Sequence, residues 1–196
     1  MNFLAHAYLS GNSEDLLIGN FIADAVKGSA INEYSGTIKH GILMHRSIDT
    51  FTDTHAVVHQ SIERLRPNYH KYAGVLVDIF YDHFLAKNWN EHSTLELKTF
   101  TTKVYSVMQT NYALLPQRSQ QMLPYMIRYD WLTNYAKLEG IQKVLIGMSR
   151  RTSFVSNMEK AIPDLEKDYD LFENEFRAFF PELVEHSKTY ISTPHS

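Results

Sequence analysis

The chain has 196 residues, of which 44% are hydrophobic and 21% are charged, so it is long enough to bury a core and too apolar for wholesale disorder. It has no cysteine, which excludes a disulfide framework, a zinc–thiolate site and a cysteine nucleophile. A formal net charge of −3 argues against general nucleic-acid binding. The sequence has neither a basic leader nor an apolar run long enough to span a membrane, so the protein is expected in the cytoplasm.

Apolar residues recur at helical spacing along the whole chain, and no alternating run rich in Val, Ile and Thr indicates a strand. Taken in chain order, helices are predicted over 3–8, 14–26, 37–53, 55–65, 72–89, a segment after Glu96, a short piece between Pro116 and Pro124, 131–148 with a break near Gly140, 153–180 interrupted near Pro163, and 181–190. The last few residues are expected to fray. Without a repeat or a linker, the fold class is all-α, a single-domain helical bundle over residues 1–196.

Polar residues mark several of the predicted helix ends. Ser13 and Thr54 precede helical stripes and are expected to be N-caps. Ser93 and Glu96 have the spacing of a capping box. Pro181 is expected to begin the last helix, because proline fits the first turn of a helix better than its interior.

Acidic and imidazole side chains recur at i, i+4 spacing on two of these helices. His45, Asp49 and Asp53 share one face of the 37–53 helix, with Arg46 beside them. Asp78 and Asp82 share a face of the 72–89 helix, and His83 follows directly. A buried charge without a partner is expensive, so inward-facing groups of this kind indicate a bound divalent metal ion.

Two earlier stretches add candidates to this group. Asp24 lies in the otherwise apolar stretch FIADAV, and His6 lies in the apolar first helix. Antiparallel packing of two helices would bring all four stretches together, so the metal site is expected mainly from residues 1–90. Asp oxygen and His nitrogen ligands suit Mn²⁺, Mg²⁺, Fe²⁺ or Zn²⁺.

Ordinary structural roles compete with this interpretation. His6 alone is typical of a hydrogen-bonded core histidine, and Asp53, which Thr54 and His55 follow, is typical of a helix end. Other catalytic motifs are missing from the sequence: it contains no G-x-S-x-G, H-E-x-x-H, G-x-G-x-x-G or Glu-x-x-His pattern.

Four stretches of the first 90 residues resemble the acyl carrier protein phosphodiesterase family. They are MNFLAHAYLS at the start, GNFIADAVKG at 19–28, GILMHRSIDTFTDTH at 41–55 and YAGVLVDIFYDHFLAKNW at 72–89. The resemblance implies an HD-domain-like helical fold and removal of 4'-phosphopantetheine from the serine of holo acyl carrier protein, with Mn²⁺ as the preferred ion. One departure is that the chain has no His-Asp dipeptide, only the reversed pair Asp82-His83.

This implied reaction, the attack of water on a phosphodiester, suggests a role for each candidate. The expected metal ligands are Asp24, Asp78, Asp82 and His83. Arg46 is expected to hold a phosphate oxygen, and His45 to transfer a proton with Asp49 orienting it. His6 and Asp53 are expected in a second shell around the metal.

An acidic carrier protein would dock on cationic groups, and the second half of the chain offers some. Arg150 and Arg151 are the expected partner-binding residues, within a docking surface over 116–151. The oligomeric state cannot be read from the sequence.

Two other functions remain open at this point. The same residues would serve a metal-dependent phosphohydrolase acting on a nucleotide or another small phosphoester. A non-enzymatic helical binding protein, in which the Asp and His groups form structural ion pairs, is the other alternative.

Overall fold

The computed structural model describes residues 1–191, which form eleven α-helices and six 3₁₀ helices and contain no β-strand. The all-helical, single-domain prediction is confirmed, and the predicted fraying of the chain end falls mostly outside the described residues. The α-helices are α1 (Phe3–Leu9), α2 (Glu14–Ile22), α3 (Gly36–Thr54), α4 (Ala56–Tyr69), α5 (Ala73–Lys87), α6 (Leu97–Thr110), α7 (Gln117–Arg128), α8 (Trp131–Asn134), α9 (Leu138–Ser149), α10 (Ile162–Lys167) and α11 (Tyr169–Ile191). The 3₁₀ helices are η1 (Ala23–Ala25), η2 (Gly28–Glu33), η3 (His70–Tyr72), η4 (Trp89–Glu91), η5 (Tyr112–Leu114) and η6 (Met158–Lys160).

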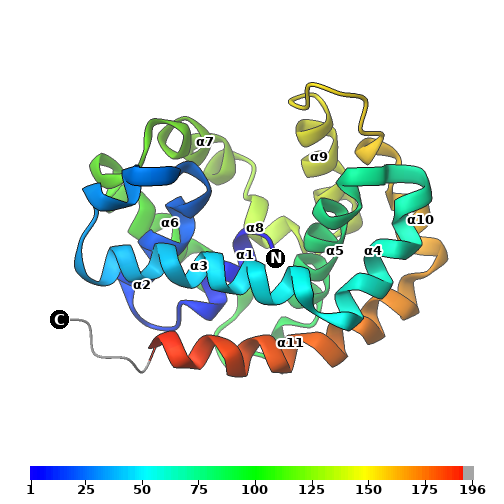
Figure 1. The fold of residues 1–196 in the computed structure, drawn as a ribbon, viewed down its shortest axis with the longest axis horizontal. Coiled ribbons are helices and arrows are strands. Elements are labelled where there is room, and N and C mark those ends of the chain that lie inside the picture. The colour runs from blue at the N-terminus through cyan, green and yellow to red at the C-terminus, as the bar shows by residue number, and fades with distance from the viewer. Residues whose placement is uncertain (192–196) are drawn as a thin grey trace.

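The short helix α1 lies in the middle of the molecule (Figure 1). Helix α3 runs across the view close to it, and α11 runs along the lower edge. Helices α6 and α7 form one end, whereas α4, α5, α9 and α10 form the other. The chain start therefore lies inside the fold, between segments from both halves of the sequence.

Helix α5 is buried along most of its length. Its side chains from Ile79 to Ala86 are all buried, which agrees with the predicted apolar helix over 72–89. Helix α11 covers it with aromatic residues: Phe176 meets Tyr81 edge to face at 5.7 Å between ring centroids, and Phe172 meets Phe80 edge to face at 5.4 Å. Burial of such rings is the main stabilising term of the core.

Helices α2 and α3 cross with their backbones nearly in contact at Gly19 and Gly41. A Cβ on Gly19 would lie 2.0 Å from the carbonyl oxygen of Ile38, and one on Gly41 would lie 2.5 Å from that of Leu16. Only glycine permits this approach. The crossing places Asn20 of α2 next to the turn of α3 that carries His45.

Several predicted helix ends are wrong, mostly at prolines. Pro181 lies inside the continuous helix α11, where buried residues on both sides of it, Phe179, Phe180 and Leu183, hold the helix against the core. Pro67 lies in the last turn of α4, and Pro124 lies inside α7. Tertiary packing here outweighs the cost of one lost backbone hydrogen bond.

Other predicted ends are shifted by side chains. Ser13 caps α2 as predicted and accepts from Leu16 N at 3.3 Å. The cap of α4 is His55 rather than Thr54, because its Nδ1 accepts from Val57 N. The Ser93–Glu96 capping box does not form, since Ser93 Oγ accepts from Leu95 N instead.

Two segments of the second half also differ from the prediction. Residues 153–157 are not helical. The break expected near Gly140 falls at residues 135–137, because Gly140 lies in α9 against the backbone of Asn134.

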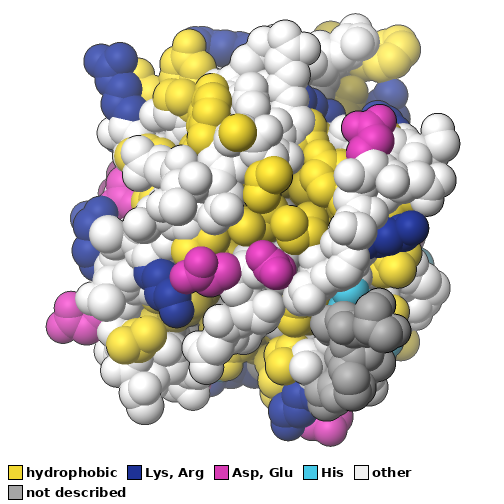
Figure 2. Space-filling model, turned by 90° about the vertical axis from the view of Figure 1, so that its left-hand side faces the viewer, with side chains coloured by type: hydrophobic (Ala, Val, Ile, Leu, Met, Phe, Trp, Pro, Cys, Tyr) yellow, Lys and Arg dark blue, Asp and Glu magenta, His cyan; other side chains and the backbone are white. Residues whose placement is uncertain are grey.

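The surface of residues 1–191 includes two modest hollows. One, of about 370 Å³, lies between α6 and α7 and is lined by Gln109, Tyr112, Leu123, Pro124, Ile127 and Arg128. Figure 2 looks onto this end of the molecule and shows apolar side chains gathered on it. The other, of about 310 Å³, lies beside η3 and residues 154–157. Among residues 1–191, no helix has the length and apolar character of a membrane span.

Candidate metal centre

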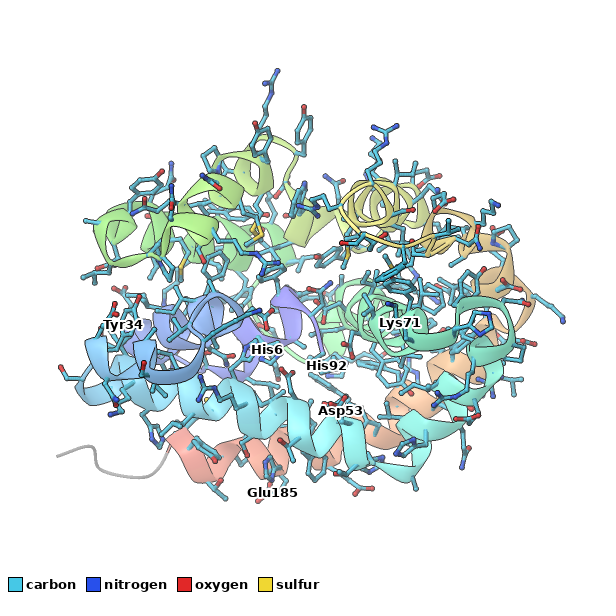
Figure 3. The ribbon with its side chains drawn as sticks, turned by 45° about the horizontal axis from the view of Figure 1, so that its top comes forward. His6, Tyr34, Asp53, Lys71, His92 and Glu185 are labelled. Atoms are coloured by element: carbon cyan, nitrogen blue, oxygen red, sulfur yellow. The ribbon has the colours of Figure 1, made fainter. Side chains whose placement is uncertain are left out.

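Two imidazoles and a carboxylate converge where α1 meets α3. Asp49 Oδ1 lies 3.2 Å from His6 Nε2, and Asp49 Oδ2 lies 3.1 Å from His45 Nε2. The two rings stack with centroids 3.9 Å apart and planes 18° apart. Figure 3 shows His6 at the centre of the molecule, with Asp53 further along α3. The ligand atoms of His6, His45 and Asp49 all lie within 4.8 Å of one another.

Asn20 fixes the ring of His45. Its Oδ1 accepts from His45 Nδ1 at 3.0 Å, while its Nδ2 donates to His6 O and to Ser10 Oγ. The Nδ1 atom of His45 therefore carries a hydrogen, and Nε2 is directed at the carboxylates. Sequence reasoning missed Asn20, although the neighbouring Gly19 is a signal of close helix approach.

Asp24 forms the exposed rim of the cluster. Its Oδ1 lies 3.4 Å from His45 Nε2, and its side chain is 71% exposed, against 9% for His45 and 4% for His6. The imidazoles thus lie at the base of a site whose carboxylates face solvent. A substrate could reach the cluster from the side of Asp24.

The proximity of these groups shifts their pKa values. Burial disfavours protonated His45, but the carboxylates of Asp24 and Asp49 outweigh it and raise its pKa to about 9. Burial and the charge of His45 lower the pKa of His6 to about 4. Burial opposes ionisation of Asp49, yet the two imidazoles hold its pKa well below the usual range. The cluster therefore has one neutral imidazole and one imidazole that shares its proton with carboxylates.

Asp78 is near this cluster but is engaged by the N-terminal amine. The Met1 ammonium donates to Asp78 Oδ1 at 2.9 Å and lies 3.9 Å from Asp49 Oδ1. Burial raises the pKa of Asp78, and the ammonium partly offsets that effect. Asp78 thus lies next to the cluster, and the Met1 ammonium, which is close to both carboxylates, connects it with Asp49.

Asp82 does not join the cluster as a free ligand, contrary to the expectation from its sequence. Its Oδ1 accepts from Asn2 N at 3.3 Å and Ala5 N at 3.2 Å, and its Oδ2 accepts from Leu4 N at 2.8 Å. The side chain is fully buried, and burial raises its pKa to about 7 in spite of these bonds. Both oxygens are used to hold the first turn of α1.

His83 points away from the cluster, so it does not lie with the other predicted metal ligands. Its Nδ1 lies 2.8 Å from Tyr135 O, and its Nε2 lies 2.7 Å from the Tyr169 hydroxyl. Successive residues on a helix point about 100° apart, so Asp82 and His83 cannot both face α1. Asp82 and His83 therefore contact different parts of the fold.

The remaining predicted residues are exposed and lie outside the cluster. Arg46 is exposed on α3, and its Nη2 donates to Val26 O, close to Asp24 in sequence. Asp53 is exposed one turn beyond Asp49. Arg150 and Arg151 are exposed just after α9, and no described contact connects them with the cluster.

The donor set fits a divalent cation. Within residues 1–191, His45 Nε2 and His6 Nδ1 are buried without a hydrogen-bond partner of good geometry. Of these two atoms, His45 Nε2 faces carboxylates, 3.1 Å from Asp49 Oδ2 and 3.4 Å from Asp24 Oδ1, and a cation bound among these atoms would give it the aligned partner that it lacks. The Nδ1–H bond from His45 to Asn20 is also the outer contact that metal-ligating histidines commonly make.

The fold and this site define an all-helical protein with a candidate metal centre open to solvent on one side. The sequence profile of the acyl carrier protein phosphodiesterase family matches residues 1–183. The chain belongs to this family of enzymes. It is 36% identical over 186 residues to the acyl carrier protein phosphodiesterase of Photorhabdus laumondii, covering 94% of each chain. It is 33% identical over 189 residues to that of Serratia proteamaculans, covering 96% of this chain and 98% of the relative. No solved structure matches the chain.

Proposed function

We propose that this protein hydrolyses the phosphodiester that links 4'-phosphopantetheine to the serine of holo acyl carrier protein, at the cluster of His6, His45 and Asp49. The convergence of these three side chains beside the exposed Asp24 carries the proposal. The names of the relatives supply the substrate, since a phosphodiesterase of acyl carrier protein acts on that link.

We assign the divalent ion to His6, His45 and Asp49, with Asp24 as a further ligand at the rim. This differs from the set expected from sequence, in which Asp78, Asp82 and His83 were ligands and His45 was the proton donor. Mn²⁺ is the ion we expect, and the mixed nitrogen and oxygen donors also suit Fe²⁺ or Zn²⁺. A bound divalent ion supplies positive charge against the phosphate and acidifies water.

The protein side chains orient the ligands and bind the substrate. Asp49 holds both imidazoles in place, and Asn20 keeps the Nε2 atom of His45 directed at the carboxylates. Asp24, whose pKa His45 lowers, is ionised and exposed, as a carboxylate ligand at the rim must be. Arg46, exposed on α3 next to His45, is assigned to bind a nonbridging phosphate oxygen.

Docking of the carrier protein is assigned to the 116–151 region. Arg150 and Arg151 are exposed there, and Phe154 and Val155, which follow shortly after this region in sequence, are 68% and 86% exposed. Cations next to exposed apolar side chains suit an acidic protein surface.

The test is incubation of the purified protein with holo carrier protein and Mn²⁺, followed by the intact mass of the carrier. Loss of the prosthetic group in the presence of Mn²⁺, and retention of it after chelation, is the expected result. A parallel panel of nucleotides separates a general phosphohydrolase from this activity. Hydrolysis of nucleotides with an unchanged carrier would overturn the proposal, and so would no hydrolysis of either.

A further inference from the structure

The helix that delivers His6 is too short to hold itself in place. Helix α1 has seven residues, and isolated helices of this length are marginal in water. Its first backbone N–H groups have no partner within the helix. Something outside α1 must fix its position before His6 can meet Asp49.

Asp82 of α5 makes this connection. Its carboxylate accepts from the N–H groups of Asn2, Leu4 and Ala5, at distances of 2.8–3.3 Å. These donors are 77–80 residues away in sequence. Because both oxygens of the carboxylate take part, α1 is fixed in position and in rotation about its axis, and His6 follows Ala5 directly.

We propose that Asp82 is a positioning residue, which fixes the first turn of α1 so that His6 stands against Asp49. The proposal rests on the proposed function only in placing His6 in the site. It differs from a role of Asp82 as a metal ligand, because the carboxylate acts here through the backbone of α1.

Asp82→Asn tests this role, since it keeps the shape of the side chain but turns one acceptor into a donor that faces an N–H group. Mn²⁺ binding is measured by calorimetry on the wild type, Asp82→Asn, His6→Ala and the double variant. In the otherwise wild-type protein, we expect Asp82→Asn to weaken Mn²⁺ binding by about 10- to 100-fold. In the His6→Ala background we expect less than about a 2-fold effect, because the ligand that Asp82 positions is already gone.

Ser61→Ala is the matched control. Ser61 is also fully buried, and its hydroxyl bonds the Tyr81 hydroxyl of α5 at 2.8 Å and the carboxylate of Glu175. This variant is expected to lose stability but to keep the Mn²⁺ affinity. An equal loss of affinity from Asp82→Asn in both backgrounds would show that Asp82 does not act through His6, and would overturn the proposal.

Hydrogen exchange of the wild type provides a test that needs neither a folded variant nor a metal. The amides of Leu4 and Ala5 lie in the first turn, so they should exchange fast unless Asp82 holds them. Slow exchange, comparable to that of the amides inside α5, is expected. Fast exchange at both amides would overturn the proposal even if Mn²⁺ binds, whereas slow exchange without Mn²⁺ binding would refute only the metal assignment.

Discussion

Asn20 accepts a hydrogen bond from the ring of His45 at 3.0 Å, and this contact decides which nitrogen of His45 faces the carboxylates. The bond depends on the close crossing of α2 and α3 at Gly19 and Gly41. The position of a buried ligand is thus set by an amide on another helix and by two residues that have no side chain.

Replacing Asn20 by Ala is expected to weaken Mn²⁺ binding by about 10- to 100-fold, because the His45 ring loses the partner that orients it. Calorimetry gives the affinity, and circular dichroism checks that the helical content is kept. Asn90→Ala, at an exposed position outside the site, is the control and should bind as the wild type does. An unchanged affinity in Asn20→Ala would mean that the ring is held by its other neighbours.

Gly41→Ala is expected to lower the free energy of unfolding by about 1–3 kcal/mol or more, because its Cβ would lie 2.5 Å from a backbone oxygen of α2. Urea denaturation measures this change. Gly147→Ala is the matched control: it lies within α9 with no atom within 4 Å of its Cβ, and should gain about 0.5–1 kcal/mol. Equal effects in the two variants would rule out the close crossing.

Asp49→Asn should abolish tight Mn²⁺ binding and turnover, with a loss of affinity of more than about 100-fold, because the residue holds both imidazoles. Asp53→Asn, one turn further along α3 and exposed, makes the same chemical change and should leave affinity and rate nearly unchanged. The pair thus tests whether the cluster ends at Asp49. A comparable loss in Asp53→Asn would extend the site toward the C-terminal end of α3.

Mn²⁺ affinity is expected to rise with pH. The pKa of His45 is raised from 6.5 to about 9, so in the metal-free protein its ring is protonated below that value and must lose a proton before Nε2 can bind a cation. The apparent dissociation constant should fall by about tenfold per pH unit between about pH 6 and pH 8, for one proton released. Titrations in buffers of different ionisation enthalpy count the protons. A flat profile would argue that His45 is not a ligand.

Reversing charge at both Arg150 and Arg151 to Glu is expected to raise the KM for holo carrier protein by about 10-fold and to leave kcat unchanged, because these residues are assigned to docking rather than to chemistry. The change in KM should shrink at high salt. Lys167→Glu, exposed on α10 and outside the 116–151 region, is the control. Unchanged kinetics in the Arg variant would place the carrier elsewhere.

The helices could be predicted from sequence because their apolar spacing is regular, and α2, α3 and α5 all begin and end within a few residues of the predictions. The helix ends near prolines could not, as Pro181 shows: the local preference against a helix is overcome by the packing of Phe179, Phe180 and Leu183, which no local pattern reveals.

The site could be predicted only in part. The i, i+4 spacing of His45 and Asp49 correctly indicated that they share a face, and the structure brings Asp24 and His6 to them. The spacing of Asp78 and Asp82 gives equally good grounds for a site. In the structure, however, Asp78 Oδ1 accepts from the Met1 ammonium and both oxygens of Asp82 accept from backbone amides at the start of α1, and sequence periodicity does not indicate which partner a carboxylate finds. The position of His6 against Asp49 cannot be predicted in this way, because a single histidine in an apolar helix carries no spacing signal.

The dependence of α1 on Asp82 also sets an order of events during synthesis. A nascent chain that has completed α3 already contains His6, His45 and Asp49, yet the carboxylate that fixes α1 is 78 residues beyond Leu4, on a helix that is synthesised after both α3 and α4. The centre is completed only once α5 has emerged and closed this long loop. Occupancy of the site by a cation would therefore report that the amino-terminal half of the chain is fully assembled.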